Sequence, residues 1–303
     1  MLSDVSDPIV VAGVPTALGG HLAGMELAPR GLRELALLER LSGRVAGRIA
    51  DAGDVPIQPG FRVDPDPRAR NRGAICEFLP RERDFVTEAL TAAGAGARLL
   101  LLGGDCTAHA GAMAGLRAAR PERRLAIAWF DAHGDFNTPD TTPSGNVWGM
   151  PFAMLCGRGD PDLVAACDGP TVEERHAALL GGQVLDETES RMLAASPIAH
   201  FGAGMLATAP GLAALAAWAG AVAGEVDATY VAVDMDCLDA AGGWAVTMPE
   251  PDGLALGSAV AAIRVLAGAI PVAGFGPSGI TLANGDADRT VDAVVALAEA
   301  AFG

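Results

Sequence analysis

Short apolar runs alternate along the chain with longer stretches in which apolar residues recur every three or four positions. The short runs predict buried strands, and the longer, alanine-rich stretches predict amphipathic helices. Because strand and helix alternate, the pattern indicates an α/β fold with a mainly parallel sheet covered by helices on both faces. The expected strands are Ile9–Val14, Arg98–Leu102, Leu125–Phe130, Thr229–Val233 and Ile270–Phe275, and the expected helices are Arg30–Ser42, Arg81–Ala95, Ala110–Ala119, Gly211–Ala223, Leu256–Ala267 and Asp286–Phe302.

Two segments lack this pattern. Residues 51–80 are rich in Pro, Arg and Asp and are expected to form a surface loop, and residues 157–183, with Gly, Asp and Pro clusters, are expected to be irregular. The sequence contains no internal repeat and no stretch with the composition of a linker. A chain of 303 residues suits one large α/β domain, so we expect a single domain over residues 1–303.

Composition and charge exclude several classes of function. The formal net charge is −16, and so acidic a surface repels phosphate backbones and anionic lipids, so neither nucleic acid nor a membrane is an expected partner. All 21 basic residues are Arg, which excludes chemistry that needs a lysine amine, such as a P-loop or a Schiff base. The five cysteines include no Cys-x-x-Cys pair and the amino terminus has no signal-peptide pattern, so we expect reduced thiols in a cytoplasmic protein.

Three polar motifs stand at the carboxyl ends of expected strands. They are Gly103-Gly-Asp-Cys106, Asp131-Ala-His-Gly-Asp135 and Asp234-Met-Asp236. Ligand sites of open α/β sheets form at this edge, so the three motifs should converge in one place. In extended chain, the i, i+2, i+4 spacing of the second motif puts its ligand-type side chains on one side.

The carboxylates of these motifs predict a metal site. Four carboxylates gathered in one pocket with an imidazole repel one another strongly unless cations neutralise them, and a pair of divalent ions is the natural solution. The alternative interpretation is that each Asp only caps a helix or a turn.

These motifs also resemble those of a known family. Asp131–Asn146 resembles the central motif of the arginase (ureohydrolase) family, Val233–Asp239 resembles its second Asp motif, and Gly103–Cys106 resembles its Gly-Gly-Asp-His motif. Gly13–Pro15 and Ala28–Arg30 match the amino-terminal pattern more loosely. The resemblance implies an arginase-like three-layer α/β/α fold, two divalent ions (expected to be manganese) and a small-molecule substrate. It also implies a homo-oligomer, because the family often forms trimers and hexamers.

The resemblance assigns a role to each residue of the motifs. Carried over position by position, Asp131 and Asp234 would bridge both ions, and His133 and Asp236 would bind one of them. Asp135 would bind the other ion and orient the bridging hydroxide. We therefore expect Asp135 and His133 to take part in catalysis.

Cys106 departs from the family, which has a histidine ligand at this position. A thiolate is a soft ligand that favours zinc or iron over manganese. The same change occurs in a branch that resembles the hydroxyarginine hydrolase of cycloserine biosynthesis. Cys106 either ligates the first ion or is a small buried thiol beside a weakly occupied site. His109, about one helical turn further on, could replace it, but a structural role is the simpler interpretation.

Two further positions depart from the family. Trp148 stands where arginases have a histidine that passes protons to the leaving amine, and an indole cannot do this at neutral pH. Trp148 would instead form a flat wall for a planar substrate, or pack in the core. Alignment on Pro277 puts Gly274 where the family has the glutamate that receives the guanidinium, and residues 270–285 contain no acid. The plain alternative for Gly274 is a close backbone turn after a strand.

The other end of the substrate site matches better. Asn137, Ser144 and Asn146 correspond to residues that hold the α-carboxylate of arginine, and Asp186 and Glu189 correspond to acids that receive its α-ammonium. The alternative for Asn137 and Ser144 is that they only cap turns. The alternative for Asp186 and Glu189 is that they are exposed acids at the start of a helix.

The sequence therefore predicts a binuclear metal-dependent hydrolase that cleaves a C–N bond in a linear amidine. The candidate substrates are arginine, hydroxyarginine or another modified guanidino amino acid. Two alternatives remain open: a catalytically altered relative that binds or assembles without catalysis, and a mononuclear metal amide hydrolase.

Overall fold

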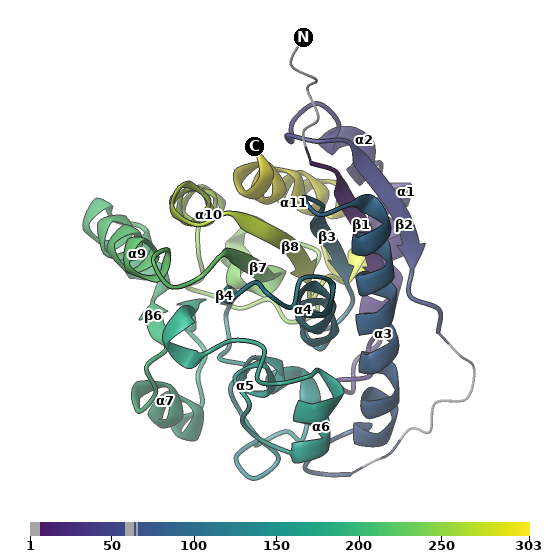
Figure 1. The fold of residues 1–303 in the computed structure, drawn as a ribbon. Helices are drawn as coiled ribbons and strands as arrows, with labels where there is room; N and C mark the ends of the chain where they lie inside the picture. Colours follow the sequence, from purple (N-terminus) through teal and green to yellow (C-terminus); the bar gives the residue numbers. More distant parts are fainter. Residues whose placement is uncertain (1–6, 58–63, 65) are drawn as a thin grey trace.

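The structure, a computed structural model, describes residues 7–57, 64 and 66–303. Eight parallel strands form one sheet in the order β2-β1-β3-β8-β7-β4-β5-β6, with helices on both faces (Figure 1). The expected three-layer α/β/α architecture is confirmed. The strands are β1 (Ile9–Val14), β2 (Ile49–Asp54), β3 (Arg98–Gly103), β4 (Leu125–Asp131), β5 (Ala177–Gly181), β6 (Ala199–Phe201), β7 (Ala228–Asp234) and β8 (Val272–Ser278).

The helices divide into two groups, each of which covers a separate hydrophobic core. Helices α1, α2 and α8 to α11 contribute to the core on one face, and α3 to α7 contribute to the core on the other. Side chains of β1 alternate between the cores: Val11 belongs to the first and Val10 to the second. The α-helices are α1 (Ala28–Glu34), α2 (Leu37–Leu41), α3 (Arg72–Ala93), α4 (Ala108–Ala119), α5 (Pro151–Leu155), α6 (Pro161–Ala166), α7 (Glu187–Ala194), α8 (Ala203–Leu206), α9 (Ala209–Val222), α10 (Leu256–Ala269) and α11 (Ala287–Phe302).

The prediction of a surface loop over residues 51–80 is wrong for most of its described part; residues 58–63 and 65 lie outside the described residues. Its first residues belong to β2, an edge strand without a fully buried residue, which the polar sequence disguised. Helix α3 begins at Arg72 and runs through Pro80. Because proline usually marks a helix boundary, the pattern placed this start one residue after Pro80.

Other boundaries also differ from the prediction. Residues 157–183 are not irregular throughout, since they contain α6 and the fully buried five-residue strand β5. The expected helix Arg30–Ser42 is divided into α1 and α2 at Ala36, whose φ of 60° is left-handed. The last strand begins at Val272 and extends to Ser278.

Four adjacent central strands place their carboxyl ends at one edge of the sheet. These strands are β3, β8, β7 and β4. Asp234 pairs with Ser278, and Phe130 pairs with Val233, so the motifs that follow these strands start side by side. Within the described part of the chain, no helix is long and apolar enough to cross a membrane.

Candidate metal centre and substrate pocket

The three motifs meet at this edge and form a cluster of potential metal ligands. One set consists of Cys106, Asp131 and Asp135, and a second set consists of Asp131, His133 and Asp236. In each set the ligand atoms lie within 4.8 Å of one another. Asp131 belongs to both sets, which is the arrangement that a carboxylate bridging two ions would need.

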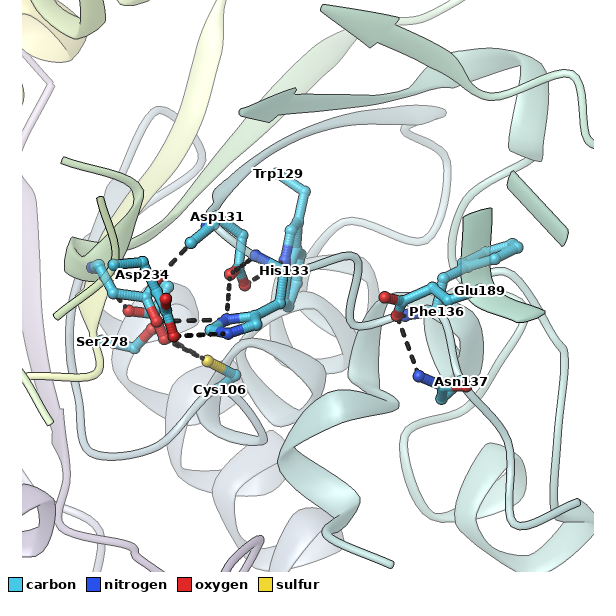
Figure 2. A network of polar contacts seen from close by, with 12 residues as sticks. Cys106, Trp129, Asp131, His133, Phe136, Asn137, Glu189, Asp234 and Ser278 are labelled. Atoms are coloured by element: carbon cyan, nitrogen blue, oxygen red, sulfur yellow. Dashed lines mark hydrogen bonds and ion pairs between the residues drawn. The ribbon is translucent and has the colours of Figure 1, made fainter. Parts of the chain in front are cut away.

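Asp234 lies beside the first set. Its Oδ2 accepts a hydrogen bond of 2.7 Å from Cys106 Sγ, and its Oδ1 accepts one of 3.0 Å from the backbone N–H of Asp236 (Figure 2). The structure thus brings together all six predicted metal ligands, although Asp234 belongs to neither three-residue set.

Backbone and indole N–H groups hold the carboxylates in place. Asp131 accepts hydrogen bonds from the indole of Trp129 at 3.0 Å and from the backbone of His133 at 2.7 Å. The backbone N–H of Ala132 donates to Asp236 across 3.2 Å. Nδ1 of His133 lies 3.3 Å from both Asp131 Oδ1 and Asp236 Oδ2. The ring therefore already faces the oxygens with which it would share an ion.

The cluster fits divalent cations because it holds too much buried negative charge without them. Burial, and then the charge of Asp131, raises the pKa of Asp135 well above its usual range and that of Asp236 to about 6. The pKa of Asp234 is also raised, by burial and by Asp236. Oδ2 of Asp135 is buried and has no hydrogen-bond partner among the described residues. Two divalent ions would neutralise these oxygens and occupy that free one.

His133 supplies the main positive charge to the cluster in the absence of metal. Burial lowers its pKa, but hydrogen bonds to Asp131 and Asp236 outweigh this effect and raise the pKa far above the usual value. Asp135 has a left-handed φ of 47°, which is unusual for a residue with a side chain. Such strain is typical of functional sites, where the surrounding structure imposes the geometry.

A buried hydrogen-bond chain lies behind Cys106. Ser278 Oγ is 3.6 Å from Cys106 Sγ and 3.0 Å from His109 Nε2, and His109 Nδ1 is 2.8 Å from the hydroxyl of Tyr230. Burial lowers the pKa of His109 to about 3, so this ring is neutral. With both nitrogens engaged and no exposed surface, His109 is a structural residue and not a substitute ligand.

The cluster forms the floor of a pocket of about 350 Å³. Five of the predicted ligands line it, and Asp131 lies buried beneath them. The pocket is also lined by all six predicted substrate-binding residues, namely Asn137, Ser144, Asn146, Trp148, Asp186 and Glu189.

One wall of the pocket is acidic. Asp186 caps α7 by accepting from the backbone N–H of Glu189, and the Asn137 amide donates to Asp186 Oδ2 at 2.8 Å and to Glu189 Oε1 at 3.3 Å. Burial and the charge of Asp186 raise the pKa of Glu189 to about 7. A Cβ atom at Gly134 would lie only 2.4 Å from the Glu189 carboxyl carbon, so the missing side chain makes room for this acid. Two acids with spare oxygens at this wall could receive an ammonium group.

Another part of the pocket lining is the turn that contains Asn146 and Trp148. Ser144 is exposed, and its Oγ accepts from the backbone N–H of Asn146. The half-buried indole of Trp148 packs against the loop after β1, where a Cβ at Gly20 would lie 1.9 Å from the ring. The indole is therefore both part of the pocket wall and a packing element.

Two ionisable residues at the site were not predicted from the sequence. His21 lines the pocket, and its Nδ1 is 3.3 Å from Asn146 Oδ1. Glu250 places Oε1 3.5 Å from Nε2 of His133, on the side of the ring away from Asp131. Both lie in connecting segments, and no motif or periodicity in the sequence pointed to either.

The alternative interpretation of Gly274 as a turn after a strand is wrong. Gly274 lies inside β8, paired with Leu99 and Tyr230, and is not among the residues that line the pocket. A Cβ there would meet the Tyr230 ring at 2.9 Å, so a glutamate does not fit. At the carboxyl end of β8, Gly279 lines the pocket and a Cβ on it would lie 2.1 Å from Asp234 Oδ1. As the sequence indicates, residues 270–285, which include this strand end, contain no acid.

Comparisons with known proteins agree with this geometry. A sequence profile described as the arginase family matches residues 7–301. The chain belongs to the arginase family. It is 36% identical to the arginase of Bacillus caldovelox over 189 residues, which span 61% of each chain. The aligned region thus covers about three fifths of this curated relative.

Solved structures of other proteins share the fold over nearly the whole length of the chain. The native arginase of Bacillus caldovelox superposes with a TM-score of 0.88 at 29% identity, and 98% of each chain is covered. The formimidoylglutamase of Bacillus subtilis has a TM-score of 0.74 at 20% identity, covering 100% of this chain and 88% of that one, and shows the fold alone.

Proposed function

We propose that this protein is a binuclear metal-dependent hydrolase that cleaves a C–N bond in a linear amidine carrying an amino-acid end. The observation that carries the proposal is the pair of ligand sets that share Asp131 on the floor of a pocket with an acidic wall. Membership of the arginase family supports the class of reaction.

The donor set indicates which residues would hold the ions. Cys106, Asp131, Asp135 and Asp234 would surround one ion, and Asp131, His133, Asp234 and Asp236 the other. When bound, such ions lower the pKa of a water molecule and supply hydroxide at neutral pH. Glu250, beside Nε2 of His133, would fix the orientation of that ring.

The side chains of the pocket have separate roles in this proposal. Asp135 reaches the floor with one free carboxylate oxygen, which would orient the attacking oxygen. Asp186 and Glu189 would receive the substrate ammonium, and Asn137 holds both acids in position. Ser144 and Asn146 would face the carboxylate, and Trp148 would bound the planar amidine.

The substrate is a guanidino amino acid, either arginine or a modified form such as hydroxyarginine. The strand end at Ser278 and Gly279 offers no carboxylate to bind a cationic guanidinium. A less basic amidine depends less on such a carboxylate, because an uncharged group does not form charge-assisted hydrogen bonds that the missing carboxylate would take away. We therefore expect modified guanidines to be hydrolysed as efficiently as arginine or more efficiently.

Metal analysis followed by turnover tests this function. The metal-free protein is titrated with Mn²⁺, Zn²⁺ and Fe²⁺, bound ions per chain are counted by mass spectrometry, and each loaded form is incubated with arginine, hydroxyarginine and related guanidines. Two ions per chain together with urea or hydroxyurea are expected. Two bound ions without turnover would contradict the hydrolase, and much less than one ion per chain would favour a binding role.

One observation favours a mononuclear enzyme as the second candidate. Burial, and then the charge of Asp234, raises the pKa of the Cys106 thiol well above its usual range. A thiol that keeps its proton is a poor ligand, so the set with His133 could fill alone. One ion per chain, with full activity, would establish this candidate.

A further inference from the structure

The loop after β1 carries an imidazole into the pocket wall, outside the acidic cluster. His21 lines the pocket with Asn146 and Trp148. We propose that His21 transfers a proton to the nitrogen that leaves the substrate. This assignment rests on the proposed hydrolysis of a C–N bond.

The reaction needs such a group. Hydrolysis forms a C–O bond at the amidine carbon and breaks a C–N bond, whose electron pair stays on the nitrogen. An alkylamine leaves readily only if this nitrogen takes up a proton as the bond breaks. The imidazolium gives its proton to the leaving nitrogen. The attacking water loses a proton to solvent, and the imidazole takes up a proton from solvent in turn. The elements of one water molecule are thereby added, and no other reactant is consumed.

The other proton carriers in the pocket have different tasks. Nδ1 of His133 faces Asp131 and Asp236 at 3.3 Å, as a metal ligand would. Among the described residues that line the pocket, His21 is the only other imidazole. Imidazole is the side chain that most readily gives and regains a proton at neutral pH.

The loop that carries His21 is fixed from two sides. Asp105, buried in the motif after β3, accepts a hydrogen bond of 2.7 Å from the backbone N–H of Gly19. The backbone N–H of Trp148 donates to Gly19 O across 2.9 Å, and the indole lies over Gly20. The His21 ring is 5.7 Å from the indole, between ring centroids. His21 is thus held at the pocket wall even though it is exposed to solvent.

Asn146 fixes the direction of the imidazole. Arg70 Nε can only donate, and it donates to Asn146 Oδ1 at 3.2 Å. Both ends of the Asn146 amide contact His21 Nδ1, with Oδ1 3.3 Å away and Nδ2 3.1 Å away. Either contact holds the ring through Nδ1, so Nε2 is the nitrogen left to do the chemistry. Nε2 of His21 has no hydrogen-bond partner among the described residues, so substrate and solvent can reach it.

Leaving-group dependence tests the assignment. The wild type, His21→Asn and His21→Ala are compared on the best alkylguanidine found in the substrate screen and on its guanidinooxy counterpart, whose leaving nitrogen is a much weaker base. We expect each variant to lose about 10²-fold in kcat on the alkylguanidine, with little change in KM and a much smaller loss on the guanidinooxy compound. Added imidazole should restore part of the lost kcat in His21→Ala.

A matched control and two further measurements separate chemistry from folding. His200→Asn changes another exposed histidine, whose Nε2 bonds Gly181 O outside the pocket, and should leave both rates unchanged. Bound metal and melting temperature should be equal in all variants. Unchanged kcat in both His21 variants, an equal loss on both substrates or a loss of bound metal would overturn the assignment. If the wild type turned over neither compound, the proposed function itself would fail.

Discussion

Cys106 donates its thiol proton to Asp234 Oδ2 across 2.7 Å, so the two residues share a proton at the floor of the pocket. Burial, and then the charge of Asp234, raises the pKa of this thiol. An ion that uses Cys106 as a ligand must therefore displace the proton, and binding becomes tighter as the pH rises. We therefore expect this pair to influence which metal ion the proposed site binds.

Cys106→His should shift the metal preference from Zn²⁺ toward Mn²⁺, because it replaces a soft thiolate with a harder imidazole nitrogen. Metal content after dialysis against equal concentrations of the two ions measures the change. Cys106→Ser is the matched control: it keeps a small hydrogen-bond donor to Asp234 and should lose Zn²⁺ without gaining Mn²⁺. An unchanged ratio of the two ions in Cys106→His would exclude ligation by residue 106.

The metal-free protein should become less stable as the pH rises from about 4 to 7. The pKa is raised by burial to about 6 for Asp236 and to about 7 for Glu189. A carboxyl whose pKa is higher in the folded than in the unfolded chain stabilises the fold below its ordinary pKa, and this stability is lost as the pH rises through the folded value. Each of the two acids contributes on the order of 3 kcal/mol to this loss.

Urea unfolding with chelator or with saturating metal, across this pH range, measures the difference between the two forms. Bound cations keep the ligand Asp236 charged at low cost, whereas Glu189 is not a ligand and behaves alike in both forms. The loaded protein should therefore lose about 3 kcal/mol less than the metal-free protein over this pH range. Ion-paired acids elsewhere, such as Asp160 with Arg72, are common to both forms and cancel in the difference. Parallel pH profiles for the two forms would contradict the cation-neutralised cluster.

Asp186→Asn should raise KM for a guanidino amino acid by roughly 10- to 100-fold, because a charge-assisted hydrogen bond to the ammonium is lost. The same change should leave KM nearly unchanged for an analogue without the α-amino group. Glu187→Gln removes the neighbouring acid of α7, whose side chain is 87% exposed, and serves as the control. Equal effects of Asp186→Asn on both compounds would place the ammonium elsewhere.

Much of this fold and part of its site could be predicted from sequence. The strands that end at the cluster are short apolar runs followed at once by polar motifs, and a parallel sheet necessarily brings those ends to one edge. Edge strand β2 has a weak hydrophobic pattern, because it contains two Asp and no fully buried residue. The first turns of α3 bury Ile75, Phe78 and Leu79, but Pro80 suggested a helix boundary after them. The turn suggested for Gly274 was wrong because the apolar run ends at Phe275, whereas β8 continues to Ser278.

His21 and Glu250 could not be found from sequence for a different reason. Each reaches the site through contacts between segments far apart in the chain: Gly19 with Asp105 and Trp148 in one case, and Glu250 with His133 in the other. Such contacts depend on loop conformation, for which this sequence has no periodic signal.

Gly134→Ala should disturb the acidic wall while leaving the metal ligands in place. The added Cβ would lie 2.4 Å from the Glu189 carboxyl carbon, so this acid must move away from the backbone N–H of Phe136, to which it is bonded at 2.9 Å. Because Asn137 links Glu189 to Asp186, we expect a higher KM for amino-acid substrates. Steady-state kinetics and metal content measure this, and loss of bound metal with unchanged KM would contradict it.

Gly20→Ala should displace the His21 loop from the indole that supports it. The new Cβ would lie 1.9 Å from the Trp148 ring, and this overlap should cost about 1–3 kcal/mol of the free energy of unfolding. Since the same loop holds His21, kcat on an alkylguanidine should fall as it does in His21→Asn. Gly204→Ala is the matched control, because a Cβ there, in α8, meets open space. Denaturant unfolding and kcat measure the two effects, and a destabilised Gly20→Ala protein with wild-type kcat would show that the loop is not needed for proton transfer.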